Sequence, residues 1–439
     1  MEITTQLAGR LHQGLHPLSD AGDLDPLLER IGNARCVLLG EASHGTSEYY
    51  VWRTRISERL IREKGFSFIA VEGDWPDCYE VNRYARGLPG SALSAREALS
   101  VFRRWPIWMS IWMWANEEVA ELVEGLRRYN DGLPEGERVG FYGLDVYSLW
   151  ESLEAVMEYL QREHPDAVEA ARRAYRCFEP YSGSAREYAR ATAFVPTSCE
   201  DEVVGMLSEL LRGAAEHPED GSEAHFAAEQ NAIVARNAEA YYRAMIRGGA
   251  SSWNVRDRHM AETLGRLLDR HGPDAKAIVW EHNTHVGDAR FTDMADRGLL
   301  NVGQLARERW GEEEVVLVGF GSHRGTVVAG ARWGAPMERM LVPPARDGSW
   351  EDALHHAGGE DGLLVFSGPE IEELLQERDH RAIGVVYDPG SERYSNYVPT
   401  VLPSRYDAFV YLEETRALRP LHAPWSGELE EPQTFPSGE

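Results

Sequence analysis

The chain has 439 residues, of which 43% are hydrophobic and 27% charged, so it has ample material for a large core. Asp and Glu total 72 against 45 Lys and Arg, which gives a net charge of −27. A field of that sign repels phosphate backbones and anionic lipid, so we expect neither nucleic acid nor a membrane as a partner. No apolar run approaches the roughly 18 residues that span a bilayer. The first residues do not resemble a signal peptide, and we expect a cytoplasmic protein.

The four cysteines, Cys36, Cys78, Cys177 and Cys199, are far apart and show no CxxC spacing. We therefore expect neither a disulfide framework nor a thiolate zinc site.

The predicted elements alternate along the chain between strands and helices. Short apolar runs, each ending at a polar residue, predict strands that are buried on both faces. They cover residues 36–39, 68–71, 139–144, 277–280, 315–320 and 382–387. Apolar positions that recur every three or four residues predict helices over 48–64, 117–129, 151–162 and 256–270, and Ser47 is expected to cap the first. The alternation predicts an α/β fold with a mostly parallel central sheet flanked by helices.

Residues 165–255 interrupt this alternation and contain only helical patterns, such as 201–215 and 224–247, separated by polar loops. We expect a helical insertion that forms part of the active-site cleft. The predicted organisation is an N-terminal part of the α/β core (1–164), the insertion (165–255), a C-terminal part of the core (256–420) and a flexible Pro- and Glu-rich tail (421–439).

Polar residues follow several predicted strands. In open parallel sheets, ligands bind beyond the carboxyl ends of the strands, so these residues are expected to share one cleft. They are Gly40-Glu41-Ala42-Ser43-His44-Gly45, Glu72, Asp145 and Glu281-His282-Asn283-Thr284-His285, with Arg53 on the helix after the first motif.

His44 is the predicted catalytic base of this cleft. An imidazole titrates near neutral pH and can take a proton from water, and Glu41 or Glu72 beside it would fix its tautomer. The alternative is a histidine that bonds only to backbone in a tight turn.

His282 and His285 have H-x-x-H spacing at another strand end. With His44 and Glu72 they form a nitrogen and oxygen set that leaves a metal-dependent hydrolase open as an alternative. There is no HExxH motif and no Cys-rich cluster, so our prediction contains no metal and no cofactor.

Two kinds of side chain are expected to bind the substrate. Arg53 and Arg258 are suited to an oxyanion or a carboxylate, whereas Asp257 is interpreted as a structural partner of a neighbouring arginine. Trp108 and Trp112 belong to a segment, 105–114, with four tryptophans, which indicates either helix packing or an aromatic wall for a bulky ligand. A protein that binds such a ligand without turnover is a further alternative.

Several motifs are absent from the sequence. Ser322 lies in G-F-G-S-H, with Phe320 where a nucleophile elbow requires glycine. The sequence also lacks a P-loop and a G-x-G-x-x-G after the first strand. These absences disfavour a serine hydrolase, a nucleotide hydrolase and a dinucleotide enzyme, and favour a histidine that activates water directly.

Five motifs together carry a family resemblance: GEASHGTSEYYVWR at 40–53, VEGDWPD at 71–77, GLDVYSLWESL at 143–153, WNVRDRHMAETL at 253–264 and HNTHVGDAR at 282–290. Their order resembles the erythromycin esterase family over residues 20–420. The resemblance implies an α/β core with added helices that hydrolyses a macrolide lactone or related ester, a small-molecule substrate, without a covalent intermediate or a metal. On matching positions His44 would be the general base, oriented by Glu41 and Glu72. The resemblance also implies that Arg53 and Arg258 lie in the same cleft, and that His282 and His285 relay protons or donate to an oxyanion. It leaves the oligomeric state open.

Two positions depart from the family pattern. Ala115 follows the Trp-Met-Trp sequence where the family usually has arginine, and Glu281 precedes His282 where a small residue is expected. Glu281 is expected to add negative charge beside the site, and both changes are expected to reshape substrate choice.

Overall fold

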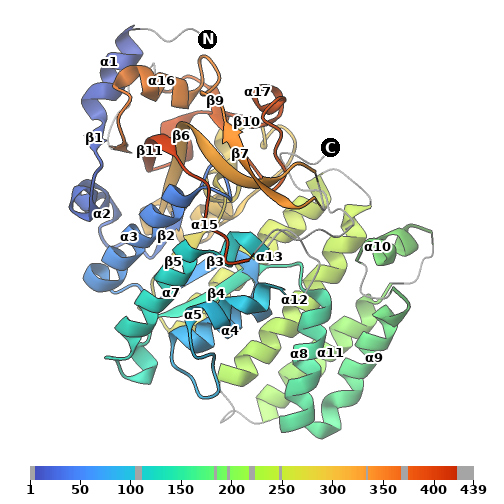
Figure 1. Ribbon diagram of the computed structural model, residues 1–439. Coiled ribbons are helices and arrows are strands. Elements are labelled where there is room, and N and C mark those ends of the chain that lie inside the picture. The colour runs from blue at the N-terminus through green and yellow to red at the C-terminus, as the bar shows by residue number, and fades with distance from the viewer. Residues whose placement is uncertain are drawn as a thin grey trace.

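The computed structural model describes residues 5–103, 111–181, 185–194, 198–216, 223–246, 250–332, 335–366 and 374–422. A nine-stranded sheet runs through the molecule and has helices on both faces (Figure 1). Its central strands are parallel, in the order β11 (Ala408–Thr415), β6 (Val315–Gly330), β2 (Cys36–Leu39), β5 (Ala277–Trp280), β3 (Phe68–Asp74) and β4 (Gly140–Asp145). The predicted α/β fold with a mostly parallel sheet is confirmed.

Antiparallel strands extend the sheet at one side. β8 (Gly362–Val365) pairs with β11, and β1 (His16–Pro17) pairs with β8. β7 (Met337–Val342) pairs with the outer half of β6, while β9 (Arg378–Arg381) and β10 (Tyr397–Thr400) form a separate two-stranded sheet.

One predicted strand is wrong. Residues 382–387 form only isolated bridges, in which Ile383 pairs with Ser43 and Val386 with Gly330. The run is apolar because Ile383 and Tyr387 pack against Val327 of β6 and Val342 of β7, while the Ile383 N–H donates to the Ala42 carbonyl at 2.8 Å. The strand that completes the parallel series beside β6 is β11.

The two faces of the sheet support separate hydrophobic clusters. In β2, Val37 and Leu39 join one cluster, whereas Cys36 and Leu38 join the other. This is the alternation expected of a strand that is covered on both sides. The first face is covered by α3 (Ser47–Lys64) and α7 (Glu117–Asn130), and the second by α13 (Ala250–His271), α15 (Val302–Trp310) and α16 (Trp350–Ala357).

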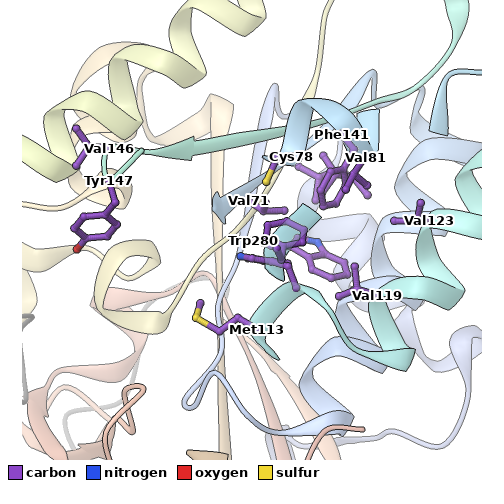
Figure 2. Packing of buried hydrophobic residues seen from close by; sticks show 14 of the residues in the cluster. Val71, Cys78, Val81, Met113, Val119, Val123, Phe141, Val146, Tyr147 and Trp280 are labelled. Atoms are coloured by element: carbon purple, nitrogen blue, oxygen red, sulfur yellow. The ribbon is translucent and has the colours of Figure 1, made fainter. Parts of the chain in front are cut away.

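A large aromatic side chain anchors the first face. Figure 2 shows Trp280 of β5 packed among Val71 of β3, Phe141 of β4 and Val119 of α7. Its indole N–H donates to Ser57 Oγ of α3 at 3.0 Å. Trp280 therefore packs β3, β4, β5 and the covering helices α3 and α7 together, directly before the loop that carries Glu281 and His282.

Within the described part of residues 165–250 all regular structure is helical, in α9 (Val168–Phe178), α10 (Ala185–Phe194), α11 (Glu200–Glu216) and α12 (Glu223–Met245). These helices gather at one end of the molecule beside α8 (Leu149–Glu163) (Figure 1). The polar loops at 182–184 and 217–222 and the tail from residue 423 lie outside the described residues. The proposed domain boundaries stay a prediction, and α13 runs unbroken across the one at 255.

The cysteine expectation is wrong for one pair. Cys177 of α9 and Cys199, directly before α11, form a disulfide with their Cα atoms 5.8 Å apart. Cys36 and Cys78 are free and buried. Composition could not reveal this pair because the fold, and not the sequence spacing, brings the two cysteines together. Among the helices described, none is both long enough and apolar enough to cross a membrane.

The start of α3 also differs from the prediction. Thr46 occupies the N-cap position, and Ser47 is the first residue of the helix. The Ser47 hydroxyl donates to Glu118 Oε1 of α7 at 2.6 Å and so links the two helices.

Candidate active site

The loop between β2 and α3 positions a histidine against a carboxylate. His44 Nδ1 lies 2.9 Å from Glu41 Oε1, and Arg53 Nη2 of α3 donates to Glu41 Oε2 at 2.6 Å. All three residues are buried. The Arg53 guanidinium lies over the rings of Tyr50 and Trp280, 4.3 and 4.6 Å from their centroids. Because Glu41 accepts from Nδ1 of His44, Nε2 is the nitrogen left to take a proton.

This loop is fixed by the backbone. The Gly45 carbonyl accepts hydrogen bonds from the N–H groups of Val328 and Leu418, both at 3.0 Å. A Cβ at Gly45 would lie 1.9 Å from the Val328 carbonyl oxygen, so only glycine fits beside β6. The Tyr50 hydroxyl donates to the His44 carbonyl at 3.0 Å. The position of the imidazole is therefore set before any ligand binds.

Glu72 at the end of β3 meets an arginine from α13. Arg256 Nη2 donates to Glu72 Oε1 at 2.7 Å. The same guanidinium donates to both oxygens of Asp145, at 2.9 and 2.6 Å. Glu72 Oε2 accepts the backbone N–H of His282 at 2.8 Å. The ends of β3, β4 and β5 are therefore joined through one buried cation.

His285 lies on the other side of this arginine. Its Nε2 is 3.0 Å from Arg256 Nη1 and 3.5 Å from Glu72 Oε1. Its Nδ1 is 2.8 Å from Asp257 Oδ1, and the ring stacks on Trp253 with centroids 4.5 Å apart. Asp257 therefore orients His285 and does not pair with a neighbouring arginine as expected.

His282 presents an unused donor beside His44. Its Nδ1 lies 2.8 Å from Thr284 Oγ1 and accepts the Thr284 N–H at 3.3 Å as the cap of α14 (Asn283–Val286). With Nδ1 as the acceptor, the proton of the neutral ring lies on Nε2. Nε2 is buried and has no hydrogen-bond partner among the residues that the structure describes. The rings of His44 and His282 have centroids 4.9 Å apart. Burial and the nearby His44 lower the pKa of His282 well below its usual range, which keeps the ring neutral.

The charges of His44 and Glu72 support one another. Burial lowers the pKa of His44, but Glu72 and Glu41 outweigh that effect and raise it above 6.5. Burial raises the pKa of Glu72, but His285, Arg256 and His44 outweigh that effect and lower it well below its usual range. The site therefore holds a carboxylate whose pKa is lowered and a histidine whose pKa is raised, so each favours the charged form of the other.

Glu281 does not add the negative charge expected beside the site. Its side chain is fully buried, and neither carboxyl oxygen has a hydrogen-bond partner among the described residues. Burial first, then the charges of Glu72 and Asp257, raise the pKa of Glu281 well above its usual range. Both effects favour the uncharged form of Glu281.

The structure brings together Glu41, His44, Arg53, Glu72, His282 and His285, as predicted, but not Arg258. Arg258 is exposed on α13, because residues two apart on a helix do not share a face. Arg256 takes the place predicted for Arg258. The signal that could have found it is the buried spacing of Trp253, Arg256, Asp257 and Met260 on α13.

The two tryptophans that were predicted to bind the substrate, Trp108 and Trp112, have different outcomes. Trp108 lies outside the described residues. Trp112 in α6 (Ile111–Trp114) is buried in the hydrophobic core, which agrees with the packing alternative and not with a substrate wall. Trp114 donates its indole N–H to the Glu72 carbonyl at 3.0 Å, so it supports the backbone of a site residue.

Comparisons with known proteins agree on one family. The family model described as erythromycin esterase matches residues 61–415. YbfO of Bacillus subtilis (strain 168) is 21% identical over 421 residues, which cover 89% of this chain and 86% of that protein. Erythromycin esterase type II of Escherichia coli is 23% identical over 386 residues, 82% of this chain and 87% of that protein.

Solved structures share the fold. The crystal structure of a succinoglycan biosynthesis protein has a TM-score of 0.76 at 21% identity and covers 95% of this chain and 98% of that chain. A mutant erythromycin esterase in its open conformation has a TM-score of 0.63 at 16% identity, with coverage of 94% and 97%.

Proposed function

The chain belongs to the erythromycin esterase family and is a hydrolase, and from that premise we propose that it cleaves a lactone or related carboxylic ester with water activated by His44. The observation that carries this proposal is the arrangement of His44, bonded at Nδ1 to Glu41 and flanked by the Nε2 donor of His282. One group can accept a proton from water, and the other can donate to the oxygen of the attacked carbonyl.

The proposed reaction needs no bond to the protein. His44 Nε2 removes a proton from water, and the hydroxide oxygen attacks the ester carbonyl carbon. Negative charge develops on the carbonyl oxygen and is met by the His282 Nε2–H. The tetrahedral intermediate collapses with cleavage of the carbon–oxygen bond. His44 then returns its proton to the departing alkoxide, which gives an acid and an alcohol.

The carboxylates and arginines have supporting roles in this proposal. Glu41 fixes the tautomer of His44, and Arg53 orients Glu41 through a hydrogen bond to its second oxygen. Glu72 favours the protonated form of His44, which stabilises the imidazolium that forms during attack. Because Asp145 holds the Nε and Nη2 edge of the Arg256 guanidinium, that cation fills the position between Glu72 and His285. Because Arg256 already fills this position, direct activation of water is favoured over a metal ion bound by the same histidines and carboxylates.

The proposal also names a class of substrate. A macrolide lactone is the first candidate because the Escherichia coli relative is an erythromycin esterase, and other small lactones and esters follow. We propose a cytoplasmic hydrolase of a small molecule, with neither nucleic acid nor membrane as partner, since the charge of −27 disfavours both.

A mass-spectrometric screen of macrolides, lactones and simple esters tests this function. We expect a product heavier by one water from the wild type and none from His44→Ala. His356→Ala is the matched control, since His356 lies on α16 away from the site and should leave the product unchanged. Recovery of every compound intact, with one of them bound to the protein, would contradict hydrolysis and favour a binder.

A further inference from the structure

A second cluster of histidines and a carboxylate lies outside the proposed active site. His323 comes from β6, His355 from α16 and Glu413 from β11. Each contributes one potential ligand atom, and these atoms lie within 4.8 Å of one another. Three elements far apart in the sequence therefore converge on one point, and the proposed reaction uses none of these side chains.

The contacts within the cluster are close. His355 Nδ1 lies 2.9 and 3.1 Å from the two carboxylate oxygens of Glu413. The rings of His323 and His355 stack with centroids 4.0 Å apart and planes within 9°. Two protonated imidazoles would repel each other at this separation, so the stack requires at least one neutral ring.

His323 supplies an unsatisfied nitrogen. The residue is only 5% exposed, and its Nδ1 is buried without a hydrogen-bond partner among the described residues. A neutral imidazole with a free lone pair is the form that binds a metal ion. A buried polar atom without a hydrogen-bond partner is otherwise unfavourable, so we expect this nitrogen to bind a ligand.

The surroundings fix the other groups in place. The Tyr411 hydroxyl donates to Glu413 Oε2 at 2.6 Å, and the Glu413 backbone N–H donates to Asp361 Oδ1 at 2.8 Å. Arg381 Nη1 donates to the His323 carbonyl at 2.8 Å. Such outer contacts orient the side chains of a metal site. The His355 side chain is 38% exposed, which gives an ion access from solvent.

We propose that His323, His355 and Glu413 bind a divalent transition-metal ion such as Zn²⁺ and so tie β6, α16 and β11 together. Two imidazole nitrogens and one carboxylate oxygen are ligands that Zn²⁺ accepts, with water in the remaining position. The ion would replace the contact between His355 and Glu413 and would bind one imidazole nitrogen of His323. This proposal is independent of the proposed hydrolysis.

Calorimetric titration of the untagged, chelator-treated full chain with Zn²⁺ tests the site, and the absorption of bound Co²⁺ reports its coordination. We expect one equivalent to bind to the wild type. His355→Asn and Glu413→Gln should weaken that binding by more than the roughly 10- to 100-fold that loss of an outer contact costs. Both replaced side chains are partly exposed, so the variants should fold.

Two controls separate this site from others. His356→Asn changes the next residue of the same helix, outside the cluster, and His44→Asn removes a histidine of the proposed active site. Both should bind Zn²⁺ and Co²⁺ as the wild type does. The proposal would be overturned if His355→Asn and Glu413→Gln bound the ion like the wild type, if His44→Asn alone abolished binding, or if the wild type bound none.

Discussion

Arg256 of α13 donates to Glu72 of β3 at 2.7 Å, although 184 positions separate the two residues in the sequence. This contact joins the helix that follows the helical segment to the edge of the sheet. Because Arg256 also bonds both oxygens of Asp145, it neutralises two buried carboxylates at once. These hydrogen bonds make Arg256 important both for the stability of the site and for its electrostatics.

Replacing Arg256 by alanine should therefore destabilise the fold by about 3–5 kcal/mol, because it leaves buried charges without their partner. Denaturant unfolding measures this change. Arg258→Ala is the matched control, two positions away and exposed, and should alter the free energy of unfolding by no more than about 0.5 kcal/mol. Equal effects of the two replacements would contradict the role given to Arg256.

The charge of Glu72 should set the pH dependence of hydrolysis. The base must be unprotonated, so kcat/KM should rise as pH increases through the pKa of His44, which lies above 6.5. Glu72 raises that pKa, so Glu72→Gln should move the rising limb of the profile to lower pH. Glu414→Gln, which changes an exposed carboxylate outside both the proposed active site and the proposed metal site, should leave the limb in place. A shift to higher pH in Glu72→Gln would be inconsistent with this assignment.

His282 should act on the transition state and not on substrate binding. Its buried Nε2 has no hydrogen-bond partner within the described part of the chain, so it can meet the charge that develops on the carbonyl oxygen. His282→Ala should lower kcat by about 100- to 1000-fold, as loss of an oxyanion donor does, with little change in KM. Steady-state kinetics across substrate concentrations separates the two constants. A rise in KM at constant kcat would instead make His282 a binding residue.

Glu281 should make the protein less stable as pH rises. Its pKa is raised in the folded state, so above its unfolded pKa of roughly 4.3 the folded chain binds more protons than the unfolded chain. Stability must fall with rising pH over that range. Glu281→Gln removes the effect, so its melting temperature should exceed that of the wild type by a margin that grows from pH 5 to pH 8. A margin independent of pH would show that Glu281 is charged.

The sequence predicted much of the site because its residues follow buried strands. These residues lie at one edge of the sheet because the carboxyl ends of parallel strands meet there. They are Glu41, His44, Glu72, His282 and His285. The run at 382–387 misled the strand prediction, since apolar composition reports burial and says nothing of which neighbour the backbone pairs with. β11 was overlooked for the same reason.

The directions in which side chains point, and their charges, were harder to predict from the sequence. The choice between Arg256 and Arg258 depends on which face of α13 meets the sheet, and only the packed helix settles it. The uncharged state of Glu281 depends on complete burial among other carboxylates. The pairing of His282 Nδ1 with the Thr284 N–H, which leaves its Nε2 donor free, likewise depends on the turn that α14 adopts.

The most direct test of the account is a single-turnover reaction in water enriched in oxygen-18, with the best substrate from the screen, for the wild type and His44→Ala. Direct attack by water predicts that the acid product of the first turnover carries the label, and that His44→Ala forms no product at a measurable rate. An unlabelled first-turnover product, with label entering the carboxylate of Glu41 or Glu72, would show a covalent intermediate and contradict the central claim. Full activity of His44→Ala would contradict it as well.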